Sequence, residues 1–224
     1  MSFLSQIRIL RNLSPLLIPL ALLAGYLNAG GWWLRSGVTL SCLALVLCVW
    51  LLRSRRRDLV FIMLAFAFSI SGDSVLGRYS AHPMGFLAGV ILFLIAHLAY
   101  IKYCLLHGTP SRPVFWLLTA VFLSYYVFCL LPAVHPWPLN VAVLAYIFIS
   151  ILSLSSAWGM RGLGIGKWLF VVGIASLLFS DLLISLNTFM GISDFLRMIM
   201  PTYFASQIFV TASVLCCGAK GERA

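Results

Sequence analysis

The chain has 224 residues, of which 62% are hydrophobic and only 9% are charged, and its mean hydropathy is +1.07. A soluble domain of this size could not bury so much apolar surface, so lipid must be the solvent for most of the chain. The formal net charge of +10 comes from basic residues in short segments between apolar runs, where membrane topology places them, so we expect no nucleic-acid partner.

Eight apolar runs are long enough to cross a bilayer, which takes roughly 20 mostly apolar residues. They cover residues 13–30, 36–52, 58–77, 83–106, 113–131, 137–158, 166–189 and 197–217. Short connections marked by Gly and Pro leave no room for a soluble domain. The first run lacks a clear cleavage site, so we interpret it as a first helix and not as a signal peptide. The sequence predicts an all-α polytopic membrane protein, with eight transmembrane helices in one bundle and a single integral-membrane domain over residues 1–224.

The basic residues divide unequally between the two sides of such a bundle. Twelve fall on one side and three on the other, so we expect both termini to be cytoplasmic and the bacterial inner membrane to be the location. The run 53–57 contains four arginines; it fits a topological anchor, with an anionic-lipid site as the alternative. The three basic residues on the outer side are Arg35, Arg78 and Arg197.

Two aspartates fall inside apolar runs. Asp73 lies 15 residues after Asp58, and Asp181 lies 15 residues after Gly166. At 1.5 Å rise per residue, both reach a similar depth in the outer half of the bilayer. An ionisable side chain in hydrocarbon costs at least ~2.5 kcal/mol, which favours a functional role over a purely structural hydrogen bond.

Other polar residues share helix faces with these aspartates or lie at similar depths. Ser69 precedes Asp73 by one turn, and Ser185 follows Asp181 by one turn. The fourth run carries a stripe of Gly85, Gly89, Phe93 and His97, with Tyr100 on the next turn, and the eighth carries Tyr203, Gln207 and Thr211. We expect Tyr203 near the level of the aspartates, and His97 and Gln207 deeper. The third, fourth, seventh and eighth runs are predicted to surround a polar cavity that opens outward.

Several residue types give weaker signals. The four histidines are scattered at different depths, so a metal site is less favoured than metal-free chemistry. The six cysteines lie in or beside apolar runs, so we interpret them as small hydrophobes. Arg78 and Arg197 fit either a phosphate head-group site or simple helix ends.

Two carboxyl groups near one cavity suit hydrolysis by general acid–base catalysis. One group stays protonated and acts as the acid, while the other is ionised and activates water. Glycosidases use this logic on acetals. A vinyl ether is chemically related, because protonation of its β-carbon also generates an oxocarbenium ion.

Four motifs resemble the YhhN family, which includes the TMEM86-like lysoplasmalogenases. They are Gly72-Asp73-Ser74-Val75-Leu76, the stretch Gly85–Ile101 with His97 and Tyr100, Ser180-Asp181-Leu182-Leu183, and Pro201-Thr202-Tyr203-Phe204-Ala205-Ser206-Gln207. The resemblance covers about residues 36–217. It implies hydrolysis of the vinyl-ether bond of lysoplasmalogen, with Asp73 and Asp181 as the catalytic residues.

The sequence therefore predicts a cofactor-free membrane hydrolase whose substrate is a lysophospholipid drawn from membrane lipid. His97, Tyr100, Tyr203 and Gln207 would orient the aspartates or the water, and the lipid chain would lie among Phe68, Phe93 and Phe179. Three alternatives stay open. They are a small transporter or flippase that uses the aspartates for proton or cation coupling, a structural or regulatory membrane protein, and a metal-dependent hydrolase.

Overall fold

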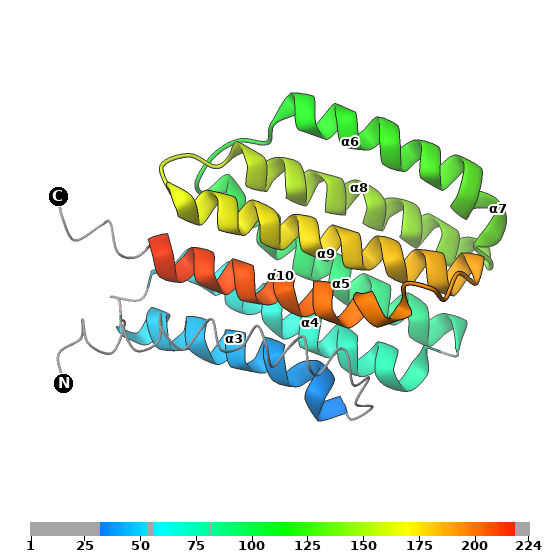
Figure 1. Cartoon of the computed structure of the whole chain (residues 1–224), viewed down its shortest axis with the longest axis horizontal. Helices are drawn as coiled ribbons and strands as arrows, with labels where there is room; N and C mark the ends of the chain where they lie inside the picture. Colours follow the sequence, from blue (N-terminus) through cyan, green and yellow to red (C-terminus); the bar gives the residue numbers. More distant parts are fainter. Residues whose placement is uncertain (1–31, 53–55, 81, 218–224) are drawn as a thin grey trace.

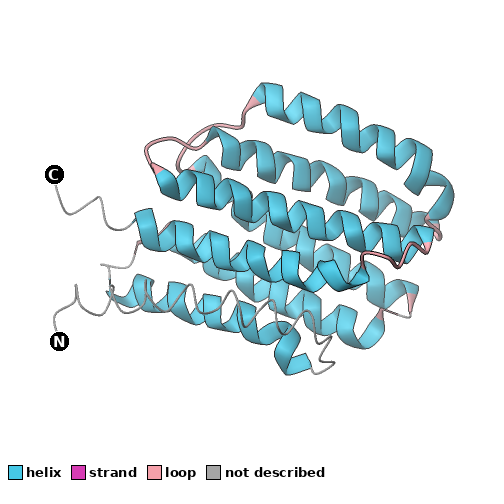
Figure 2. Ribbon diagram, viewed as in Figure 1, coloured by secondary structure: helices cyan, strands magenta, loops and turns pink. Residues whose placement is uncertain are grey.

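The computed structural model describes residues 32–52, 56–80 and 82–217, and every regular element in these residues is helical (Figures 1 and 2). The elements are α3 (Trp32–Leu52), α4 (Leu59–Tyr79), α5 (Pro83–Leu105), α6 (Arg112–Tyr125), the π-helical turn η2 (Tyr126–Leu130), α7 (Leu131–Ala133), α8 (Trp137–Gly159), α9 (Ile165–Met190) and α10 (Leu196–Cys217). The predicted span 13–30 lies outside the described residues.

Six of the described helical segments are long and apolar enough to cross a membrane, with α6, η2 and α7 forming one continuous segment, and α3 carries a shorter apolar stretch. The chain is therefore a polytopic integral membrane protein. The seven predicted spans that fall on described residues agree with these helices within a few residues. Their limits follow from local chemistry: α5, α6 and α8 have Pro in the first two helical positions, and Gly191 ends α9 with φ of 69°.

The helices are arranged as a ring. Each of α3, α4, α5, α8, α9 and α10 packs against the next, and α10 returns to α3. Helix α6 lies outside this ring and packs against α8 (Figure 1). Trp116 and Leu117 of α6 and Phe128 of η2 face the lipid; they are 67%, 66% and 79% exposed in the protein alone.

Small residues bring neighbouring helices close together where the ring needs it. A Cβ on Gly72 would lie 2.7 Å from the ring of Phe93, so glycine at this position lets α4 approach α5. A Cβ on Gly173 would lie 3.1 Å from the carbonyl oxygen of Ser206, so α9 meets the backbone of α10. Close backbone approach at small residues is a common way for membrane helices to pack.

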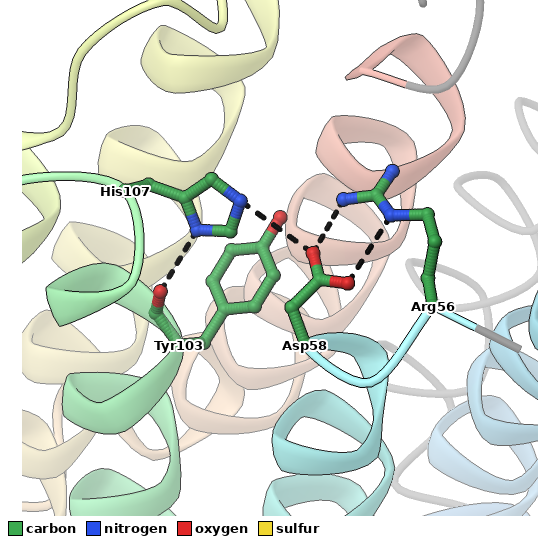
Figure 3. Close-up of polar contacts among 4 residues, drawn as sticks. All are labelled: Arg56, Asp58, Tyr103 and His107. Atoms are coloured by element: carbon green, nitrogen blue, oxygen red, sulfur yellow. Dashed lines mark hydrogen bonds and ion pairs between the residues drawn. The ribbon is translucent and has the colours of Figure 1, made fainter.

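At one end of the bundle, polar contacts join His107, which follows α5, to the segment before α4 (Figure 3). Asp58 pairs with Arg56, and its Oδ2 lies 3.5 Å from Nε2 of His107, whose Nδ1–H donates to the carbonyl of Tyr103 at 2.9 Å. Burial raises the pKa of Asp58, but the hydrogen bonds from His107 and Arg56 outweigh it and hold the pKa well below its usual range. The hydrogen bond to Asp58 in turn raises the pKa of His107.

The loop after α8 reaches the same end of the bundle. The N–H of Arg161 donates to the carbonyl of His107 at 2.9 Å, and Gly108 pairs with Met160 in an isolated β-bridge. Arg56 and Arg161, which the sequence assigned to one side, thus lie at one end of the bundle, as predicted. At the opposite end of the bundle, Arg78 is exposed near the end of α4 and Arg197 near the start of α10.

Candidate active site

Asp181 on α9 is held by two side chains from neighbouring helices. Tyr146 of α8 donates its hydroxyl hydrogen to Oδ2 of Asp181 at 2.7 Å. His97 of α5 is completely buried, and its Nε2 lies 3.2 Å from the Tyr146 hydroxyl and 3.5 Å from the same Asp181 oxygen. Since the tyrosine has one hydroxyl proton and donates it to Asp181, its oxygen accepts from Nε2–H of His97. The other ring nitrogen of His97, Nδ1, is buried and has no hydrogen-bond partner in the described part of the chain.

His97 was expected deeper than Asp181, yet the two side chains meet. The Cα–Cβ bonds of a helix tilt toward its N-terminus. Helix α5 runs in the opposite direction to α9, so His97 leans toward the end where α5 begins, while Asp181 leans back toward the start of α9. The tilt reduces the difference in level between the two side chains, and the hydroxyl of Tyr146 contacts both of them.

Asp73 on α4 is held by Tyr203 of α10. The hydroxyl of Tyr203 donates to Oδ2 of Asp73 at 2.8 Å, and Oγ1 of Thr39 on α3 lies 3.5 Å from the Tyr203 oxygen. The prediction that Tyr203 reaches the level of Asp73 is confirmed by this bond. The contact joins three ring helices around one carboxyl group.

A third polar pair lies deeper in the ring. Tyr100 of α5 donates to Oε1 of Gln207 on α10 at 3.1 Å, and both side chains are buried. Ser69 is buried beside the Tyr100 hydroxyl. The ring of His97 packs edge-on against Tyr100, with centroids 6.3 Å apart. Tyr100 thus contacts both His97 and Gln207, so buried polar side chains continue from α5 to α10.

A cavity of about 90 Å³ begins at Asp181; we call it the Asp181 cavity. Its volume is several times the ~10–15 Å³ that one water molecule requires. Its walls come from α4, α5, α6, η2, α8 and α9, and α10 contributes no lining residue. The prediction of a polar cavity between the third, fourth, seventh and eighth runs is therefore wrong for this cavity: α8 and α6 take the place of α10, and most of the lining is apolar.

The aromatic side chains predicted to hold a lipid chain are only partly at this cavity. Phe93 lines it, and its ring also packs edge-on against Tyr203, with centroids 6.1 Å apart. Phe93 thus lies between the surroundings of the two aspartates. Phe68 and Phe179 are not among the lining residues, and Phe179 is 44% exposed.

The remaining predicted residues fall into two groups. Ser185 lines the Asp181 cavity and forms a 2.8 Å hydrogen bond with the hydroxyl of Tyr125 on α6. Arg78 and Arg197 are exposed near helix ends, away from the buried pairs. Among the described residues no three His, Cys, Asp or Glu side chains gather in a group that could hold a metal ion.

Tyr146 is the site residue that reasoning from the sequence missed. It lies four residues before Ser150 on α8, and both residues line the Asp181 cavity. A polar stripe at helical spacing within the sixth predicted span was the available signal. Tyr125 carried no such signal, because only the packing of α6 brings it to Ser185.

The comparisons with known proteins identify one family. The family model described as the YhhN family matches residues 37–214, which include both aspartates and all of the buried polar partners described above. No curated protein and no solved structure matches the chain significantly.

Proposed function

Because the chain belongs to the YhhN family, we propose that it is a lysoplasmalogenase-like hydrolase. It cleaves the vinyl-ether bond of a lysoplasmalogen to a fatty aldehyde and glycerophosphoethanolamine or glycerophosphocholine. The single observation that carries the proposal is the environment of the two intramembrane aspartates. Each accepts a hydrogen bond from a tyrosine hydroxyl, and Asp181 also faces a cavity.

The reaction needs one proton donor and one proton acceptor. An acid adds a proton to the β-carbon of the vinyl ether, which leaves an oxocarbenium ion. A base takes a proton from water as the water oxygen bonds to the α-carbon, giving a hemiacetal. The hemiacetal then breaks its bond to the glycerol oxygen, which takes up a proton, and the aldehyde leaves. One of the two residues Asp73 and Asp181 is the acid and the other is the base, and no cofactor is required.

The tyrosines and His97 act through the aspartates. Tyr146 and Tyr203 fix the orientation of one carboxyl group each, because each hydroxyl occupies one carboxylate oxygen. His97 fixes Tyr146 by donating to its oxygen. The hydrogen bond between Tyr100 and Gln207 joins α5 to α10. Arg78 and Arg197, exposed near the outer helix ends, have no assigned role in this mechanism and fit simple helix ends.

Aldehyde release tests the proposal. Purified protein is supplied with lysoplasmenylethanolamine and lysoplasmenylcholine, beside the Asp73→Asn and Asp181→Asn variants. We expect aldehyde from the wild type and from neither folded variant. No aldehyde from a folded wild type across several detergents would refute the proposal. Loss of activity with a chelator and recovery with zinc would replace the cofactor-free mechanism with a metal-dependent one.

A proton-coupled transporter or flippase is the second candidate function. The connected set Asp181, Tyr146 and His97 favours it, because chains of carboxylate, hydroxyl and imidazole groups carry protons in membrane proteins. Proton-dependent movement of a lipid or solute without product formation would support this function over hydrolysis.

We also propose eight spans with both termini in the cytoplasm of a bacterium and the bundle in its inner membrane. The excess of basic residues on one side supports this orientation. The contacts among Asp58, His107 and Arg161 support it too, because they gather several of those basic segments at one end. Cysteine accessibility at Arg78→Cys and Arg161→Cys checks it: only the first position should react from outside.

A further inference from the structure

The Asp181 cavity has a cluster of polar groups at Asp181 and a mostly apolar wall, in which Tyr125 and Ser185 are polar but hydrogen-bond to each other. Asp181, Tyr146 and Ser150 lie together in this cluster. From there the lining continues along α9 through Ile184 to Phe189, a distance of about 12 Å at 1.5 Å rise per residue. Phe189 packs edge-on against Phe86 of α5, with ring centroids 5.6 Å apart, so aromatic rings close the far end.

Among the described elements, α6 is the one that lies between this cavity and lipid on one side. Phe122 and Tyr125 of α6 face the cavity, whereas Trp116 and Phe128 of the same segment are 67% and 79% exposed. Helix α6 packs mainly against α8 and lies outside the ring of six helices. The hydrogen bond between Tyr125 and Ser185 joins it to α9. The cavity is thus within one helix thickness of the bilayer core.

From these observations we infer that the Asp181 cavity binds a single hydrocarbon chain of a lipid, with the chain pointing from Asp181 toward Phe86 and Phe189. An apolar wall leaves the polar groups of a hydrated ligand without partners, which disfavours sugars, phosphates or peptides there. Dry apolar cavities take up apolar ligands readily. The carboxyl group at the other end places a reacting linkage at the start of the chain.

This chain site deepens the proposed function and rests on it for the nature of the bond that lies at Asp181. It also moves the expected position of the chain. Phe93, Phe86 and Phe189 form the wall, in place of the set of Phe68, Phe93 and Phe179 that the sequence predicted. The capacity of the cavity then sets which chain lengths are accepted.

A photolabelling experiment tests the inference without requiring hydrolysis. The probe is a saturated 1-O-alkyl lysophosphatidylcholine with a diazirine in the chain, supplied in phosphatidylcholine vesicles that contain the full-length protein. Its alkyl ether has no vinyl bond to cleave. After irradiation, labelled peptides are mapped by mass spectrometry. We expect label at Val143 on α8 and at 184–189 on α9.

A matched pair of variants provides the control. Val143 lines the cavity and is 7% exposed, whereas Val141 on the same helix is 48% exposed. Val143→Trp fills the cavity and should lower the label on 184–189 about tenfold, while Val141→Trp should leave it unchanged. If Val143→Trp fails to fold, Ile184→Phe at the cavity is compared with Val172→Phe at an exposed position of α9.

Two results would overturn the chain site. One is wild-type label confined to the exposed face of α6 and η2, such as Trp116 and Phe128. The other is equal label in folded cavity-filling and control variants. Cavity label without aldehyde release from a vinyl-ether substrate would keep the chain site and refute the hydrolase. Aldehyde release without cavity label would keep the hydrolase and refute the chain site.

Discussion

Asp73 and Asp181 differ in their surroundings, although the sequence places them at matching depths in two outward-running helices. Asp181 meets a tyrosine and a buried histidine and forms one end of a cavity. Asp73 meets Tyr203, which Thr39 approaches in turn, and is not among the residues lining that cavity. Phe93 lies between the two, against Tyr203 and in the cavity wall.

Two carboxyl groups at the same depth in the bilayer therefore need not be equally accessible to a bound lipid. A carboxyl group can act on a lipid only where the lipid can reach it. By this criterion Asp181 is the first point of contact for a bound chain. Asp73 does not line the cavity, and Phe93 packs against its partner Tyr203. In the proposed mechanism its effect therefore depends on how closely the reacting linkage approaches the Phe93 ring.

The largest expected effects come from removing either carboxylate. Asp181→Asn and Asp73→Asn should each lower aldehyde release by about 10²–10⁴-fold, because each removes an acid or a base from the reaction. The double variant should lose little more than either single variant, since the two groups act as a unit. The measurement is the rate of aldehyde release by folded protein.

Asp194→Asn is the matched control, because Asp194 is exposed and belongs to neither site. It should keep wild-type activity. Full activity in Asp73→Asn would mean that Asp181 alone is required, and it would exclude a two-aspartate mechanism.

Removing the tyrosine hydroxyls sharpens the comparison. A hydrogen bond to a charged group contributes about 1.5–3 kcal/mol, so Tyr146→Phe and Tyr203→Phe should each lower kcat about 10–100-fold. The loss should be greater for Tyr146→Phe, because His97 lies 3.2 Å from the Tyr146 oxygen whereas Thr39 lies 3.5 Å from the Tyr203 oxygen. Tyr79→Phe, at a 56% exposed position, should leave kcat unchanged. A larger loss in Tyr203→Phe would reverse the assigned order of importance.

His97 should act only through Tyr146 and Asp181. His97→Ala removes the donor to Tyr146 and should lower kcat about fivefold, in line with one neutral hydrogen bond of ~1 kcal/mol. His97→Gln keeps an N–H donor and should recover part of the loss. Rates of both variants are compared with a single substrate at saturating concentration. If the two variants lose activity equally, the hydrogen bond to Tyr146 has no positioning role.

The smallest effect is expected at the other end of the bundle, where Asp58 and His107 meet. The lowered pKa of Asp58 stabilises the fold above the ordinary carboxyl value near 3.9, and this stabilisation is lost as the pH falls through the folded value. The raised pKa of His107 stabilises the fold below the ordinary imidazole value near 6.5, and this contribution is lost as the pH rises through the folded value. Both contributions are present between about pH 4 and 6.5.

His107→Gln should therefore lower the free energy of unfolding by about 1 kcal/mol within that window and by less at higher pH. Thermal unfolding in detergent at pH 5.5 and pH 9 measures the difference. Aldehyde release should be unaffected, because the pair lies at the opposite end of the helices from Asp73 and Asp181. A destabilisation that is equal at both pH values would contradict a role for the charged imidazole.

The sequence alone determined the seven predicted helices that fall on described residues and the approximate level of most of their residues. Apolar runs of bilayer length can only be helical, since lipid offers no hydrogen bonds to the backbone, and Gly and Pro mark their ends. Rise per residue then fixes depth, so Tyr203 was predicted correctly at the level of Asp73. The same regularity placed Arg56 and Arg161 at one end.

Only the tertiary structure decided which helices are neighbours. Lipid is as apolar as a partner helix, so apolar side chains do not reveal which helix they face, and shape complementarity makes the choice. Local signals therefore gave Asp181 and His97 but not Tyr146 between them. Packing also put α8 and α6, and not α10, around the Asp181 cavity.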